Sequence, residues 1–242
     1  MRVGVYVDGF NLYYGGRSLC RRGTGGWRWL DIRALATTLV AERKNWPGAA
    51  IHRVVYCTAR IDRSDNQSGH YDQHIYLRAL HATESVDYIQ LGRYVSHLEY
   101  WPLAVPGPGD RPVLVPSLPA PVLNVIGARA NNGKVMVPIA RKEEKGSDVN
   151  VASTLLMDVL CGSVDATVLI SNDSDLELAV NKARQLVPVG VVNPSSKQTA
   201  GALRGLPADG AGRHFWRKLS ADDFTRHQLP NPAGRYIKPS DW

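Results

Sequence analysis

The chain has 242 residues, of which 44% are hydrophobic, which suffices for the core of one domain with elaborations and excludes a wholly disordered chain. Its 29 Lys and Arg residues outnumber 22 Asp and Glu residues, giving a net charge of +7 that favours a polyanionic partner. Three widely spaced cysteines suggest neither a disulfide framework nor a cysteine zinc site. The sequence shows no apolar run long enough for a signal peptide or a membrane span, so we expect a cytoplasmic protein.

Apolar runs without strict alternation, typical of strands buried on both faces, alternate with segments of helical periodicity. We expect strands at 3–7, 51–57, 87–91, 166–171 and 187–192. We expect helices at 30–43, 73–83, 149–160 and 175–186. This order predicts the α/β class, as a Rossmann-like three-layer α/β/α sandwich with a mostly parallel central sheet.

The region 101–141 interrupts this pattern, because it carries eight of the fifteen prolines and cannot hold a long helix. Asn132-Gly133 lies between extended runs and predicts a two-residue hairpin turn, with Arg129 paired to Met136 and Ile126 to Ile139. We therefore expect one domain over 1–206 with an inserted proline-rich β-hairpin region at about 101–141. Residues 207–242 are expected to form a C-terminal extension that packs on this domain and ends in a mobile stretch.

Four aspartates are expected at one edge of the sheet. Asp8 follows the first strand, Asp173 and Asp175 follow the strand 166–171, and ligands of open parallel sheets bind at such carboxyl ends. Asp148 lies at the start of a helix that enters from the same edge. Each acid also has a structural alternative: a turn at Asp8-Gly9, a helix-start acid at Asp148, and a capping box from Ser174 to Glu177.

Taken together, the four carboxylates favour a cation site, because crowded carboxylates resist ionisation unless a cation shares them. Oxygen ligands select Mg²⁺ or Mn²⁺, and no histidine is spaced for zinc. Asn11 is close enough in sequence to add a carbonyl or to orient a water. Asp158 lies about 15 Å beyond Asp148 on the expected helix, so we assign it a structural role.

Three motifs in this order resemble the NYN domains, PIN-like nucleases with a Rossmann-type sheet: VDGFN at 7–11, KGSDVNVA at 145–152 and LISNDSDLELAV at 169–180. HIYLRAL and VNPSSKQTAGALRG fit as well, so the resemblance covers nearly the whole chain. It implies a metal-dependent ribonuclease site with Asp8, Asp148, Asp173 and Asp175 as catalytic metal ligands. Thr154 stands where some relatives carry a further acid, which leaves the number of metals open.

The leading expectation is a metal-dependent endoribonuclease that hydrolyses RNA phosphodiester bonds with Mg²⁺ or Mn²⁺. The alternatives are an RNA-binding or partner-binding module with a structural ion, and a DNA nuclease. The expected partner is single-stranded RNA, and a homodimer is a further expectation. The residues expected to bind RNA are Asn11, Lys145, Arg17 and Arg141, with Arg21, Arg22 and Lys142 as further basic residues. Tyr13, Tyr14, Trp27 and Trp29 either stack on bases or pack on the core edge.

Overall fold

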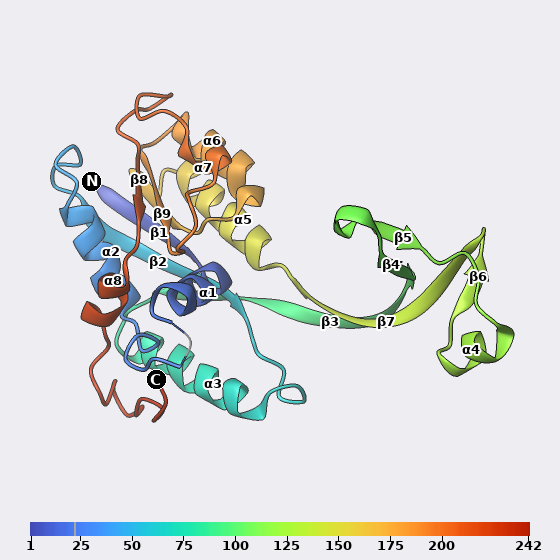
Figure 1. The fold of residues 1–242 in the computed structure, drawn as a ribbon. Coiled ribbons are helices and arrows are strands. Elements are labelled where there is room, and N and C mark those ends of the chain that lie inside the picture. Colours follow the sequence, from blue (N-terminus) through green and yellow to red (C-terminus); the bar gives the residue numbers. More distant parts are fainter. Residues whose placement is uncertain (22) are drawn as a thin grey trace. The chain divides into compact units, whose positions relative to one another are not determined.

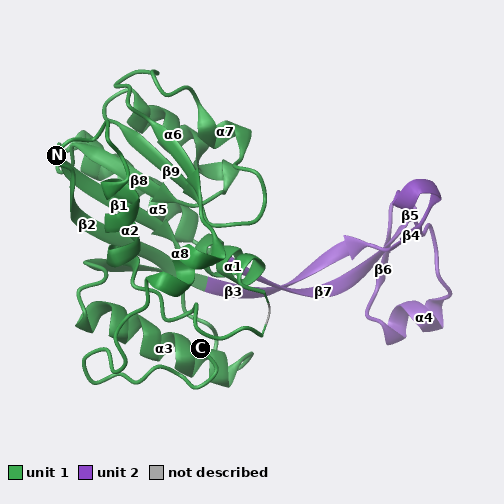
Figure 2. Cartoon of the chain, turned by 60° about the vertical axis from the view of Figure 1, so that its left-hand side comes forward, with its two compact units in different colours: residues 1–93, 145–242 green, residues 94–144 purple. Residues whose placement is uncertain are grey.

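The computed structural model describes residues 1–21 and 23–242, and its chain forms two compact units. Unit 1 comprises residues 1–93 and 145–242, and unit 2 comprises residues 94–144 (Figure 2). The strands are β1 (Arg2–Asp8), β2 (Ala50–Ala59), β3 (Tyr88–Pro102), β4 (Ala104–Pro106), β5 (Pro112–Leu114), β6 (Arg129–Asn131), β7 (Lys134–Lys145), β8 (Ala166–Ile170), β9 (Val189–Asn193) and β10 (Phe215–Lys218). The α-helices are α1 (Gly9–Leu19), α2 (Ile32–Ala41), α3 (Gln67–Ala82), α4 (Ala120–Val125), α5 (Ser147–Leu160), α6 (Glu177–Arg184), α7 (Gly201–Arg204) and α8 (Ala221–Arg226), with 3₁₀ turns η1 (Pro108–Asp110) and η2 (Ser174–Leu176).

The central sheet with its flanking helices confirms the predicted α/β class (Figure 1). Its eight strands run in the order β10-β9-β8-β1-β2-β3-β7-β6. The pairs β1·β2, β1·β8, β2·β3, β8·β9 and β9·β10 are all parallel, whereas β6 and β7 form an antiparallel hairpin. The chain adds β2 on one side of β1 and β8 on the other, so strand order reverses at β1. Ligands of open α/β sheets bind beside such a reversal.

Helices cover both faces of the sheet, because successive strand residues point to opposite sides and both sets are apolar. Val5 and Val7 of β1 pack with residues of α2, α3 and α8 in one buried cluster. Tyr6, between them, packs with residues of α5 and α6 in a second cluster on the other face. One cluster therefore lies on each face of the sheet, between the strands and the helices that cover them. Helices, sheet and helices form the three layers of the predicted sandwich.

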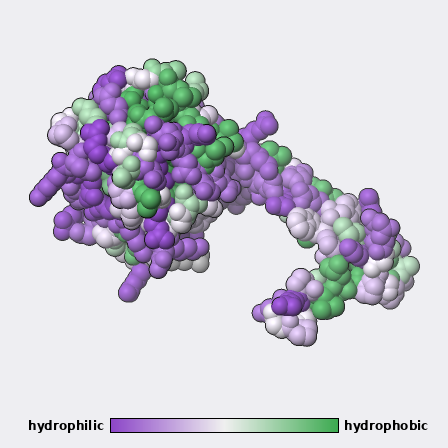
Figure 3. Space-filling model, turned by 90° about the horizontal axis from the view of Figure 1, so that it is seen from above, coloured by the Kyte–Doolittle hydropathy of each residue, from purple (hydrophilic) through white to green (hydrophobic). Residues whose placement is uncertain are grey.

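Unit 2 is an extended insertion with little buried apolar surface. Val135 is its one buried hydrophobic residue among the described positions, whereas Val105 and Val125 are examples of its exposed ones. Apolar surface is visible on this unit in Figure 3. The predicted pairing of Arg129 with Met136 is confirmed. The predicted partner of Ile139 is wrong, because Ile126 ends α4 instead of extending a strand.

The C-terminal segment contacts unit 1 through a strand and through aromatic packing. β10 adds to the sheet beside β9, and Trp29 Nε1 donates to the carbonyl of Pro230 at 3.0 Å. The terminal Trp242 ring lies 6.3 Å from the ring of Trp29 and 5.5 Å from that of Tyr76. These contacts hold the chain end against the buried cluster of α2 and α3.

Within the described residues, no helix combines the length and the apolar character that crossing a membrane requires.

The buried His214 predicts that unit 1 loses stability in acid. Its Nδ1 accepts from the backbone N–H of Val189 at 2.9 Å, and its Nε2 lies 2.6 Å from the carbonyl of Asp209, which fits the neutral ring. Burial lowers the pKa of His214, opposed by the Asp209 carbonyl and assisted by the charge of Arg184. The unfolded chain therefore binds the proton more readily, so stability is lost as pH falls below the ordinary histidine pKa of about 6.5.

We expect the free energy of unfolding of the unmodified protein to fall between about pH 7.5 and 5.5, and His214→Asn to fall less steeply across the same window. Urea unfolding of both proteins at several pH values measures the two slopes. Equal slopes would show that His214 does not carry this pH dependence.

Candidate metal centre

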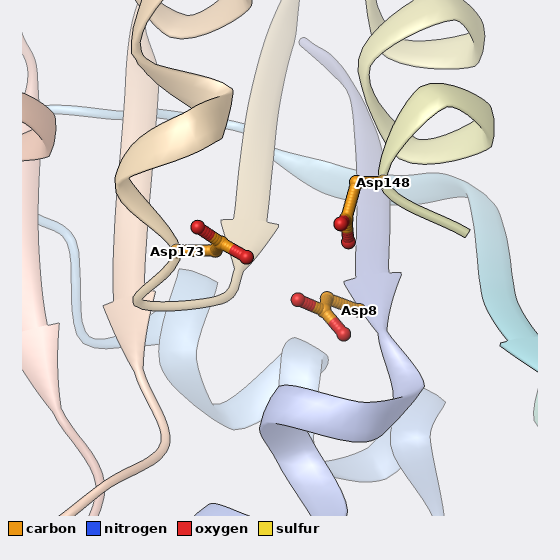
Figure 4. Close-up of side chains that lie close together, drawn as sticks. All are labelled: Asp8, Asp148 and Asp173. Atoms are coloured by element: carbon orange, nitrogen blue, oxygen red, sulfur yellow. The ribbon is translucent and has the colours of Figure 1, made fainter. Parts of the chain in front are cut away.

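Three aspartates point toward one another where strand order reverses (Figure 4). Asp8 ends β1, Asp173 follows β8, and Asp148 lies in the first turn of α5. One carboxylate oxygen from each lies within 4.8 Å of those from the other two. The chain thus brings together three acids from three elements that are far apart in sequence.

Asp8 is the buried member of this cluster, with only 1% of its surface exposed. It is the N-cap of α1, so its Oδ1 accepts from the backbone N–H of Asn11 at 2.9 Å. Its Oδ2 accepts from the Ser171 hydroxyl at 2.9 Å. Both oxygens are therefore held by donors, and each retains a lone pair for a cation.

Asp173 is oriented by the backbone of the turn that follows β8. Its N–H donates to Ser171 Oγ at 3.1 Å, and its Oδ1 accepts from the N–H of Asp175 at 3.0 Å. Asp173 is thus the N-cap of η2, and the alternative of a capping box from Ser174 to Glu177 is wrong, since α6 has no side-chain cap. The Ser171 hydroxyl contacts both Asp8 and the Asp173 backbone, so one side chain fixes two of the three acids.

Asp175 lies outside the cluster, so the predicted convergence of all four aspartates is wrong at this residue. It is exposed in the first turn of η2, where its backbone N–H, and not its carboxylate, takes part in the turn. An acid two residues after the N-cap also interacts favourably with the turn dipole. The structure therefore brings together three of the four predicted carboxylates.

Asp148 reaches the cluster because α5 begins at this edge of the sheet. Gly146 precedes the helix with φ of 104°, a left-handed conformation that a side chain rarely adopts. This turn leads β7 directly into α5, and Asp148 is the second residue of the helix. Glycine at 146 is thus a local requirement of the geometry that presents Asp148.

The electrostatics of the three acids favour a bound cation. Burial is the largest cause of a raised pKa at Asp8, and the charge of Asp173 raises it further against the hydrogen bonds from Asn11 and Ser171. Burial and the charges of Asp8 and Asp148 also raise the pKa of the neighbouring Cys57 to about 12. A divalent cation would neutralise this negative field, and three carboxylates suit Mg²⁺ or Mn²⁺.

Asp158 has the structural role predicted for it. Its carboxylate accepts from the Tyr6 hydroxyl at 2.8 Å and pairs with Arg53, which joins α5 to β1 and β2. These contacts lie further along the helix than Asp148 and its acidic cluster.

The residues expected to bind RNA are distributed over both units. The Asn11 side-chain oxygen accepts from the Asn172 N–H at 3.2 Å and so holds the β8 loop against α1. Arg17 is half-buried on α1, and Lys145 ends β7 in unit 1. Arg141 belongs to unit 2 and pairs with Glu99 and Glu143 at 3.2 and 2.5 Å, which satisfies its charge locally. Arg22 lies outside the described residues.

Two of the four aromatic residues pack in the core, which is the second of the two alternatives that the sequence left open. Trp27 and Trp29 are buried, with exposed fractions of 2% and 0%. Tyr13 and Tyr14 are exposed on α1, the helix that Asp8 caps.

The structural role of Asn172 in the loop that follows β8 was not predicted. Asn172 Nδ2 donates to the carbonyl of Gln198 at 3.1 Å, and its Oδ1 accepts from the N–H of Ala200 at 2.8 Å. Asn172 therefore ties the β8 loop to the loop that follows β9. Its position directly before Asp173 was the available signal, because asparagine commonly bonds backbone groups in turns.

Replacing Ser171 by alanine is expected to weaken Mn²⁺ binding about 10- to 100-fold, because groups that orient metal ligands have effects of this size. The hydroxyl that links Asp8 to the Asp173 backbone would be lost. Ser153→Ala is the matched control, since that hydroxyl bonds only carbonyls of its own helix. Calorimetric Mn²⁺ titration measures the affinities, and equal values for the two variants would contradict the assigned role.

The chain is similar in sequence to a protein of named function along its whole length. The chain is 28% identical, over 264 aligned residues, to the 6-hydroxy-3-succinoylpyridine 3-monooxygenase HspA of Pseudomonas putida, covering 100% of this chain and 75% of that protein. A crystal structure of a protein of unknown function from Vibrio parahaemolyticus aligns with a TM-score of 0.44 and 17% identity, over 92% of this chain and 94% of that one. No family model matches the chain.

The comparison overturns the predicted enzyme class. The HspA protein is named as a monooxygenase, which is an oxidoreductase, whereas the sequence motifs predicted a hydrolase of phosphodiester bonds. The name of this relative therefore contradicts the predicted class of metal-dependent endoribonuclease. The motif acids imply cation binding more directly than they imply a reaction, because the same carboxylates serve structural and catalytic ions alike.

Proposed function

We propose that this protein binds one Mg²⁺ or Mn²⁺ ion through Asp8, Asp148 and Asp173, and that the bound ion holds a phosphate of single-stranded RNA. The proposal concerns binding and does not include hydrolysis. The observation that carries it is the convergence of the three carboxylates within 4.8 Å at the strand-order reversal. A hard cation with open coordination positions accepts phosphate oxygens readily, and Mg²⁺ in particular is commonly bound by one or two carboxylates plus phosphates.

The charge distribution supports a polyanion at unit 1. The chain has 29 basic and 22 acidic residues, of which unit 2 holds five and four, so nearly all of the net positive charge belongs to unit 1. Without a cation the acidic cluster would repel a phosphate, despite this positive surface. The metal converts the cluster from a repulsive to an attractive site, and so RNA binding should depend on it.

Fluorescence anisotropy of a short labelled single-stranded RNA tests the proposal. At constant ionic strength, we expect the affinity to fall at least about tenfold when chelator replaces Mn²⁺, since one charged contact is worth more than 1.4 kcal/mol. Asp8→Asn should lose the Mn²⁺ dependence. Asp175→Asn should keep it, because this exposed acid lies outside the cluster.

Metal-independent binding by the unmodified protein would contradict the proposal. The RNA is recovered on a denaturing gel after each titration and is expected to keep its full length. Metal-dependent shortening that Asp8→Asn abolishes would overturn the restriction to binding.

A second candidate function is oxidation of a hydroxylated pyridine, which the alignment over 100% of this chain favours. A monooxygenase places one atom of O₂ in the substrate and reduces the other to water with two electrons from a donor. Oxygen consumption with 6-hydroxy-3-succinoylpyridine and reduced nicotinamide tests it. Substrate-dependent consumption matched by hydroxylated product would support this candidate, and none beyond the protein-free rate would contradict it.

A further inference from the structure

One face of α1 lies against the loops at the carboxyl edge of the sheet. Asn11 accepts from the Asn172 backbone at 3.2 Å, and Ser18 Oγ lies 2.6 Å from Ser196 Oγ. Between them, a Cβ added at Gly15 would lie 2.3 Å from the carbonyl oxygen of Pro194, so only glycine fits there. Residues three and four apart share a helix face, and these three contacts therefore define the face that borders the metal centre.

Tyr14 belongs to this bordering face, since it is three residues after Asn11 and four before Ser18. Its side chain is nevertheless 57% exposed. Asp8 caps the same helix, and six residues correspond to about 9 Å along its axis. An exposed aromatic residue thus lies about 1.7 helical turns along α1 from Asp8, a span that a nucleotide next to one bound at the metal bridges.

The Tyr14 ring is supported from the core by a chain of aromatic contacts. The Tyr13 and Tyr14 rings form a T-shaped pair, with centroids 5.3 Å apart and planes at 79°. Tyr13 lies 5.6 Å from the buried Trp27, which in turn packs 6.1 Å from Phe224. A T-shaped pair covers at most one face of either ring, so at least one face of the Tyr14 ring lies outside this contact. The support also limits the freedom that the ring would lose on binding.

We propose that Tyr14 is a stacking platform for an unpaired base of the RNA held at the metal centre. The inference rests on the proposed function and deepens it, because it assigns the preference for single strands to one side chain. A paired base already stacks within its duplex and presents no free face, so a duplex cannot use the platform. Arg17, three residues further along α1, is placed to contact the adjoining phosphate.

The test uses the full-length protein with Mn²⁺ and two probes of equal charge. One is a short single-stranded RNA, and the other is the same sugar–phosphate chain with every base removed. Tyr14→Ala should weaken binding of the first probe about 5- to 150-fold, the range reported for loss of one base stack, and leave the second unchanged. Tyr14→Phe should retain the affinity, because the ring remains.

Tyr71→Ala is the matched control, since Tyr71 is 64% exposed on α3. Thermal unfolding of each variant verifies that the fold is intact. Equal affinity of Tyr14→Ala and the unmodified protein for the base-containing probe, with Mn²⁺ dependence preserved, would overturn the platform alone. If RNA binding by the unmodified protein does not depend on Mn²⁺, the proposed function is wrong, and the stacking role of Tyr14 is wrong with it.

Discussion

Replacing Asp8 by asparagine is expected to abolish the stabilisation of this protein by Mn²⁺. A ligand present at a hundred times its dissociation constant stabilises the native state by about 2.7 kcal/mol, which corresponds to a rise in Tm of about 5 to 10 °C for a chain of this size. Asparagine retains an oxygen for the Asn11 N–H, so the cap of α1 is preserved. The substitution should therefore remove cation binding and leave the start of α1 intact.

In chelator the same variant should unfold at a higher temperature than the unmodified protein. Burial and the nearby Asp173 charge raise the pKa of Asp8, so its ionised form is disfavoured in the folded state, and the neutral amide removes that cost. Thermal unfolding with Mn²⁺ and with chelator measures both effects. Asp175→Asn serves as the control and should keep the full Mn²⁺ shift. A Mn²⁺ shift that persists undiminished in Asp8→Asn would place the cation elsewhere.

Replacing Arg53 by leucine is expected to destabilise unit 1 by about 3 to 5 kcal/mol, because it leaves a buried carboxylate without its charged partner. The Asp158 side chain is 8% exposed and pairs with Arg53. The remaining donor is the Tyr6 hydroxyl at 2.8 Å, which cannot neutralise the charge. The Arg53 guanidinium also stacks on Tyr88 at 4.5 Å, so its removal loses packing as well.

The structure offers a matched control in Arg2→Leu. Arg2 pairs with Asp165, but both side chains are exposed, at 49% and 42%, and such surface pairs contribute about 0 to 1 kcal/mol. Urea unfolding of both variants compares a buried pair with an exposed one. Adding Asp158→Leu to Arg53→Leu should restore much of the lost stability, since no charge is then stranded. Equal small effects of the two single changes would show that the Asp158 pair does not hold α5 to the sheet.

The strands of the sheet centre could be predicted because both of their faces are buried. The runs at 3–7 and 166–171 lie within or beside β1 and β8, where successive residues enter opposite clusters. The long strands β3 and β7 were recognised only in part, since their side chains are mostly partly exposed and carry no apolar pattern.

Helix α1 was not predicted, because Gly9, Gly15 and Gly16 are poor helix formers and Asp8-Gly9 reads as a turn. Tertiary packing overrides the propensity here. A Cβ at Gly16 would lie 2.7 Å from atoms of Phe224 and Trp27, so the glycines allow the helix to approach its neighbours closely. Such a requirement is visible only once the chain is folded.

The sequence identified the edge and the residue types of the candidate site. It could not separate Asp173 from Asp175, because both follow the same strand and only the backbone of η2 determines which carboxylate faces Asp8. The roles of Ser171 and Asn172 depend on partners more than 20 residues away in sequence. These contacts are set by how the loops meet.

The most direct test of the proposed function is whether a phosphate of bound RNA ligates a Mn²⁺ ion in this protein. Electron–nuclear double resonance of the Mn²⁺ complex with single-stranded RNA detects a ³¹P coupling when a phosphate oxygen is a metal ligand. We expect this coupling in the unmodified protein and its absence in Asp8→Asn. Bound Mn²⁺ and bound RNA without any ³¹P coupling would contradict the binding of an RNA phosphate to an ion at the acidic cluster.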